Sequence, residues 1–308
     1  MISSLVECVP NFSEGRDSGV IDALVAAVRS VDGAHLLDVS SDADHNRTVL
    51  TIVGEPDPVA DAAFRAVERA ADLIDLDRHR GVHPRIGAAD VVPFIPLRGY
   101  SMSQCVTLAR AFGRKVGREL NLPVYLYEQA ALRPERENLA YVRMDPYEML
   151  RSSILTNPER QPDYGPARLG KAGAVAVGAR GPLIAFNAHL NTADVAAAQR
   201  IARRVRTSTG GLPNVKALGF LVEDRAQVSM NLTDFRRTGV HHALEAVRAA
   251  ARDEGLMVTD TELVGLVPQA ALIDAALAYL GLPEATRTLI LEQRIGTMTG
   301  DYTEVPFE

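Results

Sequence analysis

The stretch from residue 79 to residue 97 joins reactive side chains to an apolar segment. Polar chemistry that leads directly into a buried strand allows a scaffold to hold a functional loop rigidly. The apolar part, Val91 to Leu97, is expected to be that strand. The polar part carries groups that can move protons or bind anions, namely His79, Arg80, His83, Arg85 and Asp90.

His83 is the first candidate for proton transfer. It precedes Pro84 and Arg85 and lies close to glycines, a context that predicts an accessible loop. An imidazole with an ordinary pKa of about 6.5 can donate and accept protons at neutral pH. Most histidines do no chemistry, so the residue types alone favour a surface histidine.

Metal binding by this stretch is not predicted. His79 and His83 have the i, i+4 spacing that binds metals on a helix, but Gly81 and Pro84 oppose a helix there. No third ligand completes a known zinc motif. The acidic residues at 38–44 lack the spacing of a calcium loop, so we expect no metal site.

Two prolines, Pro93 and Pro96, lie within the apolar run. Because proline has no N–H to donate, we expect this strand to be a sheet edge or to pair only in part.

The composition is that of an ordinary soluble globular protein, with 308 residues, 47% hydrophobic and 23% charged. A net charge of −6 argues against binding to nucleic acids or anionic membranes. No signal peptide and no long apolar span is evident. Cys8 and Cys105 are far apart and are expected to be reduced core residues of a cytoplasmic protein.

Strands and helices alternate along both halves of the chain. This pattern predicts an α/β (α+β) fold with two subdomains, each a mixed sheet covered mainly on one face by helices. Residues 157–170 are rich in proline and glycine, and we place the subdomains at residues 1–175 and 176–308. Residues 173–178 and 183–190 are interpreted as a hairpin.

Further polar groups stand at the ends of apolar segments or in loops. Amides such as Asn187 and Asn231 can pair with the edges of a heterocycle. Substrate carboxylates could be bound by the cations Arg47, Arg85, Arg180, Lys171 and Lys216. As a set they indicate a polar, anionic small molecule.

Several motifs, read in order, resemble the glutamate formimidoyltransferase (formiminotransferase) family. They are LVECVPNFSEG (5–15), LDV (37–39), NRTV (46–49), HRGVHPRIG (79–87), Asp90 with PFIP (93–96), PVYLY (123–127), PDYGP (162–166), LIAFN (183–187), QVSMNL (227–232) and VGLVP (264–268). The resemblance extends over nearly the whole chain.

The resemblance implies an activity. The family transfers a formimino group from N-formimino-L-glutamate to N5 of tetrahydrofolate in histidine degradation, giving 5-formimidoyltetrahydrofolate and L-glutamate. Tetrahydrofolate is then a co-substrate, and no metal is expected. The alternatives are a folate-dependent enzyme with another donor, either another formimino amino acid or 5-formyltetrahydrofolate, and a folate-binding protein without turnover.

The resemblance also implies site residues. The catalytic histidine of the H-P-R motif is His83 here. The folate-binding segment begins at Gly165 and Pro166 and ends at Gly173 and Ala174. Asp163 and Tyr164 lie beside this segment, and the remaining candidates for substrate binding are Asp38, Asn46, Arg47, Arg85, Asn187 and Asn231.

The family forms homodimers with a substrate channel between two α/β subdomains. Some relatives carry an acid two positions after Asp38, where this chain has Ser40. Animal relatives add a cyclodeaminase domain. Because this chain stops at Glu308, we expect it to be monofunctional and to need a separate cyclodeaminase.

Overall fold

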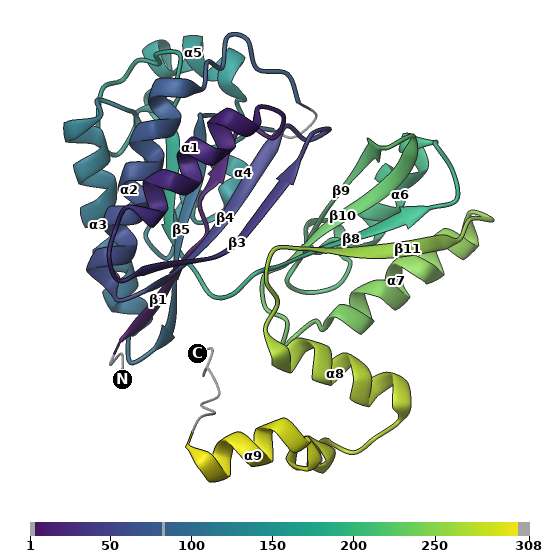
Figure 1. The fold of residues 1–308 in the computed structure, drawn as a ribbon. Helices are drawn as coiled ribbons and strands as arrows, with labels where there is room; N and C mark the ends of the chain where they lie inside the picture. The colour runs from purple at the N-terminus through teal and green to yellow at the C-terminus, as the bar shows by residue number, and fades with distance from the viewer. Residues whose placement is uncertain (1–3, 82–83, 301–308) are drawn as a thin grey trace. The chain divides into compact units, whose positions relative to one another are not determined.

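The computed structural model describes residues 4–81 and 84–300, and the chain divides into two compact units. The first unit ends at Arg180 and the second begins at Gly181. Each unit is a β-sheet with packed helices (Figure 1). Within the residues described, no helix combines the length and apolar character needed to cross a membrane.

The first unit is built on a seven-stranded mixed sheet. Its strands are β1 (Leu5–Cys8), β2 (Asn11–Phe12), β3 (Ala34–Asp42), β4 (Arg47–Gly54), β5 (Ala89–Arg98), β6 (Val124–Glu128) and β7 (Val175–Ala179). Strand β3 pairs with β4, and β1 and β2 both lie between β4 and β5. Strands β5, β7 and β6 run parallel to one another, whereas the other pairs are antiparallel.

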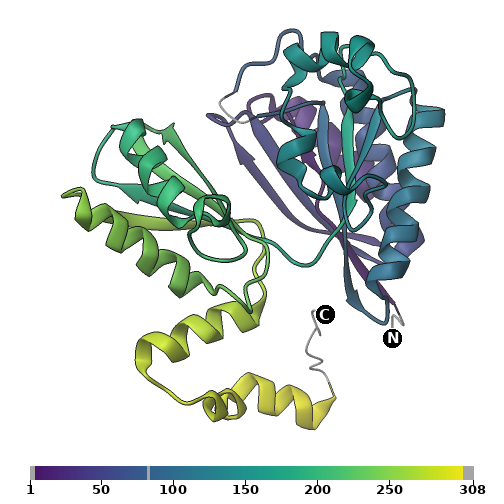
Figure 2. The ribbon, with the colours of Figure 1, turned by 180° about the vertical axis from the view of Figure 1, so that it is seen from behind.

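Three long helices pack on one face of this sheet (Figure 1). They are α1 (Ser18–Arg29), α2 (Pro56–Leu73) and α3 (Met102–Glu119). On the opposite face, α4 (Leu139–Val142), α5 (Tyr147–Thr156) and the 3₁₀ turns Pro134–Glu137 and Pro158–Arg160 accompany β5, β6 and β7 (Figure 2).

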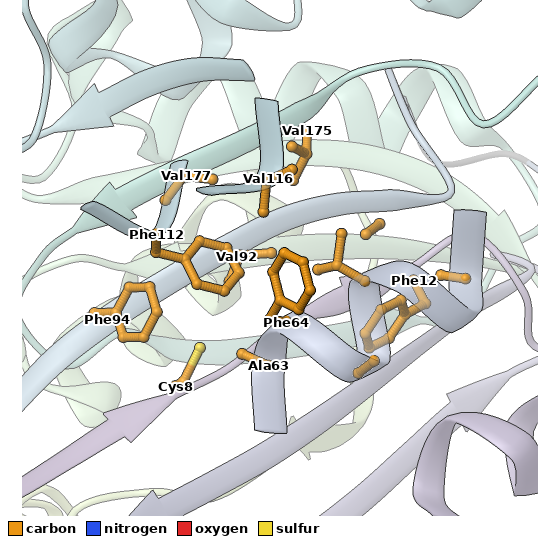
Figure 3. Packing of buried hydrophobic residues seen from close by; sticks show 14 of the residues in the cluster. Cys8, Phe12, Ala63, Phe64, Val92, Phe94, Phe112, Val116, Val175 and Val177 are labelled. Carbon is orange, nitrogen blue, oxygen red and sulfur yellow. The ribbon is translucent and has the colours of Figure 1, made fainter. Parts of the chain in front are cut away.

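The core under the three helices is apolar and tightly packed (Figure 3). The ring of Phe112 meets those of Phe94 and Phe64 edge to face, with centroids 5.2 and 6.5 Å apart. Burying one such side chain contributes about 2–3 kcal/mol to folding. Cys8 and Cys105 are fully buried in the same core, as predicted. This packing makes the sheet a rigid support for its polar face.

The second unit is a four-stranded sheet in the order β11-β8-β10-β9. The strands are β8 (Ile184–Leu190), β9 (Val215–Val222), β10 (Arg225–Leu232) and β11 (Val258–Val264). Helices α6 (Val195–Val205) and α7 (Val240–Asp253) pack against it. The chain continues through α8 (Gln269–Leu280) and α9 (Leu291–Thr299), with 3₁₀ turns at Thr207–Thr209 and Glu284–Leu289.

The predicted α/β class with two subdomains is confirmed. The pairings of the second sheet are antiparallel throughout the described residues, where a mixed sheet was expected.

The predicted hairpin of residues 173–190 is wrong. Strand β7 pairs in parallel with β5 and β6, whereas β8 pairs with β10 and β11 in the other sheet. For the same reason the units separate after Arg180 rather than between residues 175 and 176. Strand β7 is therefore the last strand of the first unit along the chain, and it lies between β5 and β6 in the sheet.

The expectation that β5 forms a sheet edge is also wrong. It lies inside the sheet, with β1 and β2 on one side and β7 on the other. The alternative of partial pairing is confirmed on the β7 side, where only Val91–Phe94 is paired. Pro96 lies beyond that contact, whereas Pro93 is opposite Gly178 of β7. On the other side of β5, the Pro93 carbonyl accepts from the Val9 N–H at 3.2 Å.

Candidate functional site

Two segments of the predicted site meet at one end of the first sheet. Isolated bridges join Gly87 to Gly173 and Val124 to Tyr164. Because β5, β6 and β7 are parallel, these bridges place both segments at the amino-terminal ends of those strands. The described residues just before β5, 79–81 and 84–88, form the loop of the site. This loop and the segment at 163–174 therefore belong to one region.

The 163–166 segment is held by a buried ion pair. Asp163 Oδ2 lies 2.8 Å from Arg136 Nη1 and accepts from the Leu126 N–H at 2.7 Å. Both side chains are at most 4% exposed. The Arg114 guanidinium lies over the Tyr164 ring, and the half-buried Pro166 follows Gly165. The Asp163 carboxylate thus attaches the segment to Arg136 and to strand β6.

Gly165 and Gly173 both have left-handed backbone conformations, with φ of +79° and +71°. A Cβ at Gly173 would lie 2.2 Å from the carbonyl oxygen of Ile86. Next to it, the Ala174 N–H donates to that same oxygen at 2.9 Å. Glycine at 173 is what allows this close approach.

We expect Gly173→Ala to lower the free energy of unfolding by about 2 kcal/mol or more, because it combines backbone strain with a steric clash. Gly170→Ala is the matched control, since a Cβ added at Gly170 would have no atom within 4 Å and the φ of this residue is not positive. Urea denaturation of both variants checks this. Equal stability of the two would contradict the close contact.

Asp90, fully buried at the start of β5, is the centre of a charge cluster. Its Oδ2 lies 2.8 Å from Arg47 Nη1 and also accepts from Arg143. Its Oδ1 accepts from the Ile86 N–H at 2.9 Å. Burial lowers the pKa of Arg47 to about 10, although Asp90 acts in the opposite direction. One carboxylate thus holds two cations and the end of the loop.

Asn46 anchors the other end of that loop. Its Nδ2 donates to the Arg80 carbonyl at 2.9 Å, and its Oδ1 accepts from the Gly15 N–H at 2.8 Å. The Asn46 carbonyl accepts from His79 Nε2 at 3.0 Å. Asn46 is buried and has a φ of +48°, a conformation that asparagine tolerates better than most residues. Its amide therefore serves the loop directly.

The predicted catalytic residue, His83, lies outside the described residues. The described chain on either side of it is fixed at Arg80 by Asn46 and at Ile86 by Asp90. Arg85 is also buried and pairs with Glu148 at 2.8 Å.

The pairing of β3 with β4 determines the face of the sheet on which Asp38 lies. Asp38 is opposite Thr51 and Ser40 is opposite Val49. Directly paired residues of antiparallel strands share a face, and Arg47, Val49 and Thr51 alternate along one strand. Asp38 and Ser40 therefore lie on the same face as Arg47.

The second unit holds the two predicted amides within a polar row. Asn187 Nδ2 donates to Glu262 at 3.1 Å, and Asn231 is exposed on β10. His189, which we did not predict, contacts Asp260 at 2.8 Å and Gln227 at 2.9 Å. A histidine two positions after Asn187 on a buried strand was the available signal, because alternate residues share a face.

Three other contributors were also missed, namely Arg136, Arg143 and Glu148. They lie in a charged stretch of the sequence, and each pairs with a residue far away in the chain. Sequence spacing contains no signal for such pairs.

Both structural units match known protein families. Residues 5–180 match the formiminotransferase domain, N-terminal subdomain, and residues 185–296 match the formiminotransferase domain. The chain belongs to the formiminotransferase family. The two matched regions of the family correspond to the two structural units.

Relatives within the family are similar over most of the chain. Glutamate formimidoyltransferase of Thermoplasma acidophilum is 48% identical, covering 95% of this chain and 97% of that protein. The protein of the same name from Streptococcus pyogenes is 44% identical, covering 91% and 94%. The formimidoyltransferase-cyclodeaminase of Mus musculus is 44% identical, covering 96% of this chain and 57% of the mouse protein.

Proposed function

We propose that this chain is a glutamate formimidoyltransferase, which moves the formimino group of N-formimino-L-glutamate to N5 of tetrahydrofolate and releases L-glutamate. The observation that carries the proposal is the 48% and 44% identity to two glutamate formimidoyltransferases over more than nine-tenths of the chain. The geometry supports it, because the loop and the 163–174 segment lie at one end of the sheet.

The reaction needs a proton transfer. N5 attacks the amidine carbon, a new C–N bond forms, and the bond from that carbon to the glutamate nitrogen breaks. The proton lost from N5 must reach the departing nitrogen, because an unprotonated amine is a poor leaving group. We assign this transfer to His83 as general acid and base. Asn46 and Asp90 hold the backbone on either side of this histidine.

Anion binding is the other requirement. Both substrates carry carboxylates, and the site region contains the cations Arg47, Arg85 and Arg143. Buried guanidinium groups bind carboxylates strongly and in a defined orientation. We assign Gly165, Pro166, Gly173 and Ala174 to folate binding, with tetrahydrofolate as a co-substrate.

A transfer assay tests the function. Purified protein is mixed with tetrahydrofolate and N-formimino-L-glutamate, the mixture is acidified, and 5,10-methenyltetrahydrofolate is followed by its absorbance. We expect product with this donor and little with formiminoglycine. Acid alone converts 5-formyltetrahydrofolate to the methenyl compound, so with 5-formyltetrahydrofolate and glutamate the readout is N-formyl-L-glutamate, of which little is expected. Product only with another donor would change the substrate, and folate binding without product from any donor would indicate a binding protein.

We also propose that the protein acts as a homodimer. Helices α8 and α9 expose large apolar side chains, including Leu280 at 69% and Met298 at 83%. Apolar surface of this kind is typical of contact regions. Sedimentation equilibrium is expected to give twice the chain mass, and a monomer at all concentrations would refute this.

A further inference from the structure

A pocket of about 350 Å³ lies in the first unit, beside the loop. It is lined by Leu76, Asp77, His79, Arg80, Gly81, Arg85, Tyr147 and Glu148. Two of these residues, His79 and Arg85, are 7% and 9% exposed. Among the described residues, neither His79 Nδ1 nor Arg85 Nε has a hydrogen-bond partner. Buried polar atoms normally have partners, so these two indicate a ligand.

The hydrogen-bonding character of both atoms can be assigned. His79 Nε2 faces the Asn46 carbonyl at 3.0 Å, and a carbonyl only accepts, so Nε2 carries the hydrogen. Burial lowers the pKa of His79 below its ordinary value, which keeps the ring neutral. His79 Nδ1 is then an acceptor, whereas Arg85 Nε is a cationic donor. Arg85 lies next to the backbone of His79, since Arg85 Nη2 donates to the His79 carbonyl at 3.3 Å, and the charge of Arg85 contributes to the lowered pKa of His79.

The present partner of Arg85 is readily replaced. The Arg85 side chain is 10% exposed, but that of Glu148, its partner at 2.8 Å, is 58% exposed. Burial raises the pKa of Glu148, but the hydrogen bond from Arg85 contributes to a net lowering, so the pair is ionised. An exposed carboxylate loses little when it returns to water, whereas a buried guanidinium needs an anion. Another carboxylate can therefore take the place of Glu148.

We propose that this pocket binds the amino-acid end of the donor, with its α-carboxylate on Arg85 in place of Glu148 and its adjacent N–H on His79 Nδ1. The ligand class is an N-substituted α-amino acid, and the assignment rests on the proposed function. A carboxylate beside an N–H matches an arginine donor beside a histidine acceptor. Arg80, exposed on the same pocket, supplies a cation for the second carboxylate of glutamate.

Calorimetry with N-acetyl-L-glutamate, a stable analogue with the same N–H and carboxylates, tests the pocket. Arg85→Met is expected to weaken its binding at least 100-fold, and Arg85→Lys less. Glu148→Gln is expected to tighten it several-fold by removing the competing carboxylate. Arg78→Met is the matched control, because Arg78 belongs to the same segment but is 89% exposed. That variant should bind as the wild type does.

Changes in the ligand separate binding from a merely structural role. The α-amide of N-acetyl-L-glutamate should bind wild type weakly, and Arg85→Met should no longer distinguish acid from amide. N-acetyl-N-methyl-L-glutamate, which lacks the N–H, should bind at least tenfold more weakly than its parent. Equal loss of acid and amide binding in Arg85→Met, or no binding of the acid to wild type, would overturn the proposal.

Failure of the pocket and failure of the function give different results. Tetrahydrofolate binding, measured alongside, should change less than threefold in Arg85→Met. Loss of folate binding with intact amino-acid binding would assign the pocket to the other substrate and refute the proposal. Arg85-dependent binding in a protein without transfer activity would support the pocket and refute the proposed function.

Discussion

His83→Ala is expected to lower kcat for formimino transfer by about 10²- to 10⁴-fold, the usual contribution of a positioned general acid and base. The tetrahedral intermediate would still form, but the glutamate nitrogen would depart slowly without a proton. The change adds no volume. Folate binding and thermal stability should therefore stay close to those of the wild type.

The measurement is the initial rate of transfer at saturating concentrations of both substrates. His242→Ala is the matched control, since His242 is an exposed histidine on α7 and should have no effect. A near-normal rate in His83→Ala would remove His83 from the mechanism. A low rate together with lost folate binding would instead indicate a binding role.

Local patterns in the sequence predicted the elements of the fold better than their connections. Strand β7 is a short apolar run, and this pattern is typical both of a buried parallel strand and of one strand of a hairpin. The choice depends on β5 and β6, which are distant in the chain. The prolines of β5 led to the wrong prediction of a sheet edge for a related reason. The neighbouring strands β1 and β7 each pair with only part of β5, and such a strand tolerates residues that have no N–H.

The candidate site was predictable where its residues are close in sequence. Asp90 and Arg47 were predicted from their residue types and Asn46 from the resemblance, and the structure brings all three to the loop. Asn46 and Asp90 hold protein backbone, and the predicted part of Asn46 in substrate binding stays a prediction. The role of His83 stays a prediction. Arg143 could not be found, because its pairing with Asp90 spans 53 positions of the chain.

Asp90→Asn is expected to cost about 3–5 kcal/mol of the free energy of unfolding, because it removes the negative member of a buried charge cluster. The side chain of Asp90 is fully buried, and those of Arg47 and Arg143 are 11% and 15% exposed. An amide can still accept from the Ile86 N–H, but its NH₂ group would then face guanidinium donors. Two cations would be left without their carboxylate.

Urea denaturation of Asp90→Asn measures this cost, with Asp61→Asn as control. Asp61 also pairs with a cation, Lys115 at 3.0 Å, but the two side chains are 60% and 38% exposed. Its loss should cost no more than about 1 kcal/mol. Adding Arg143→Gln to Asp90→Asn should recover part of the stability, since it removes one unpaired cation. If the single variants prove equally stable, or the second change destabilises further, the cluster does not depend on Asp90 as its counter-ion.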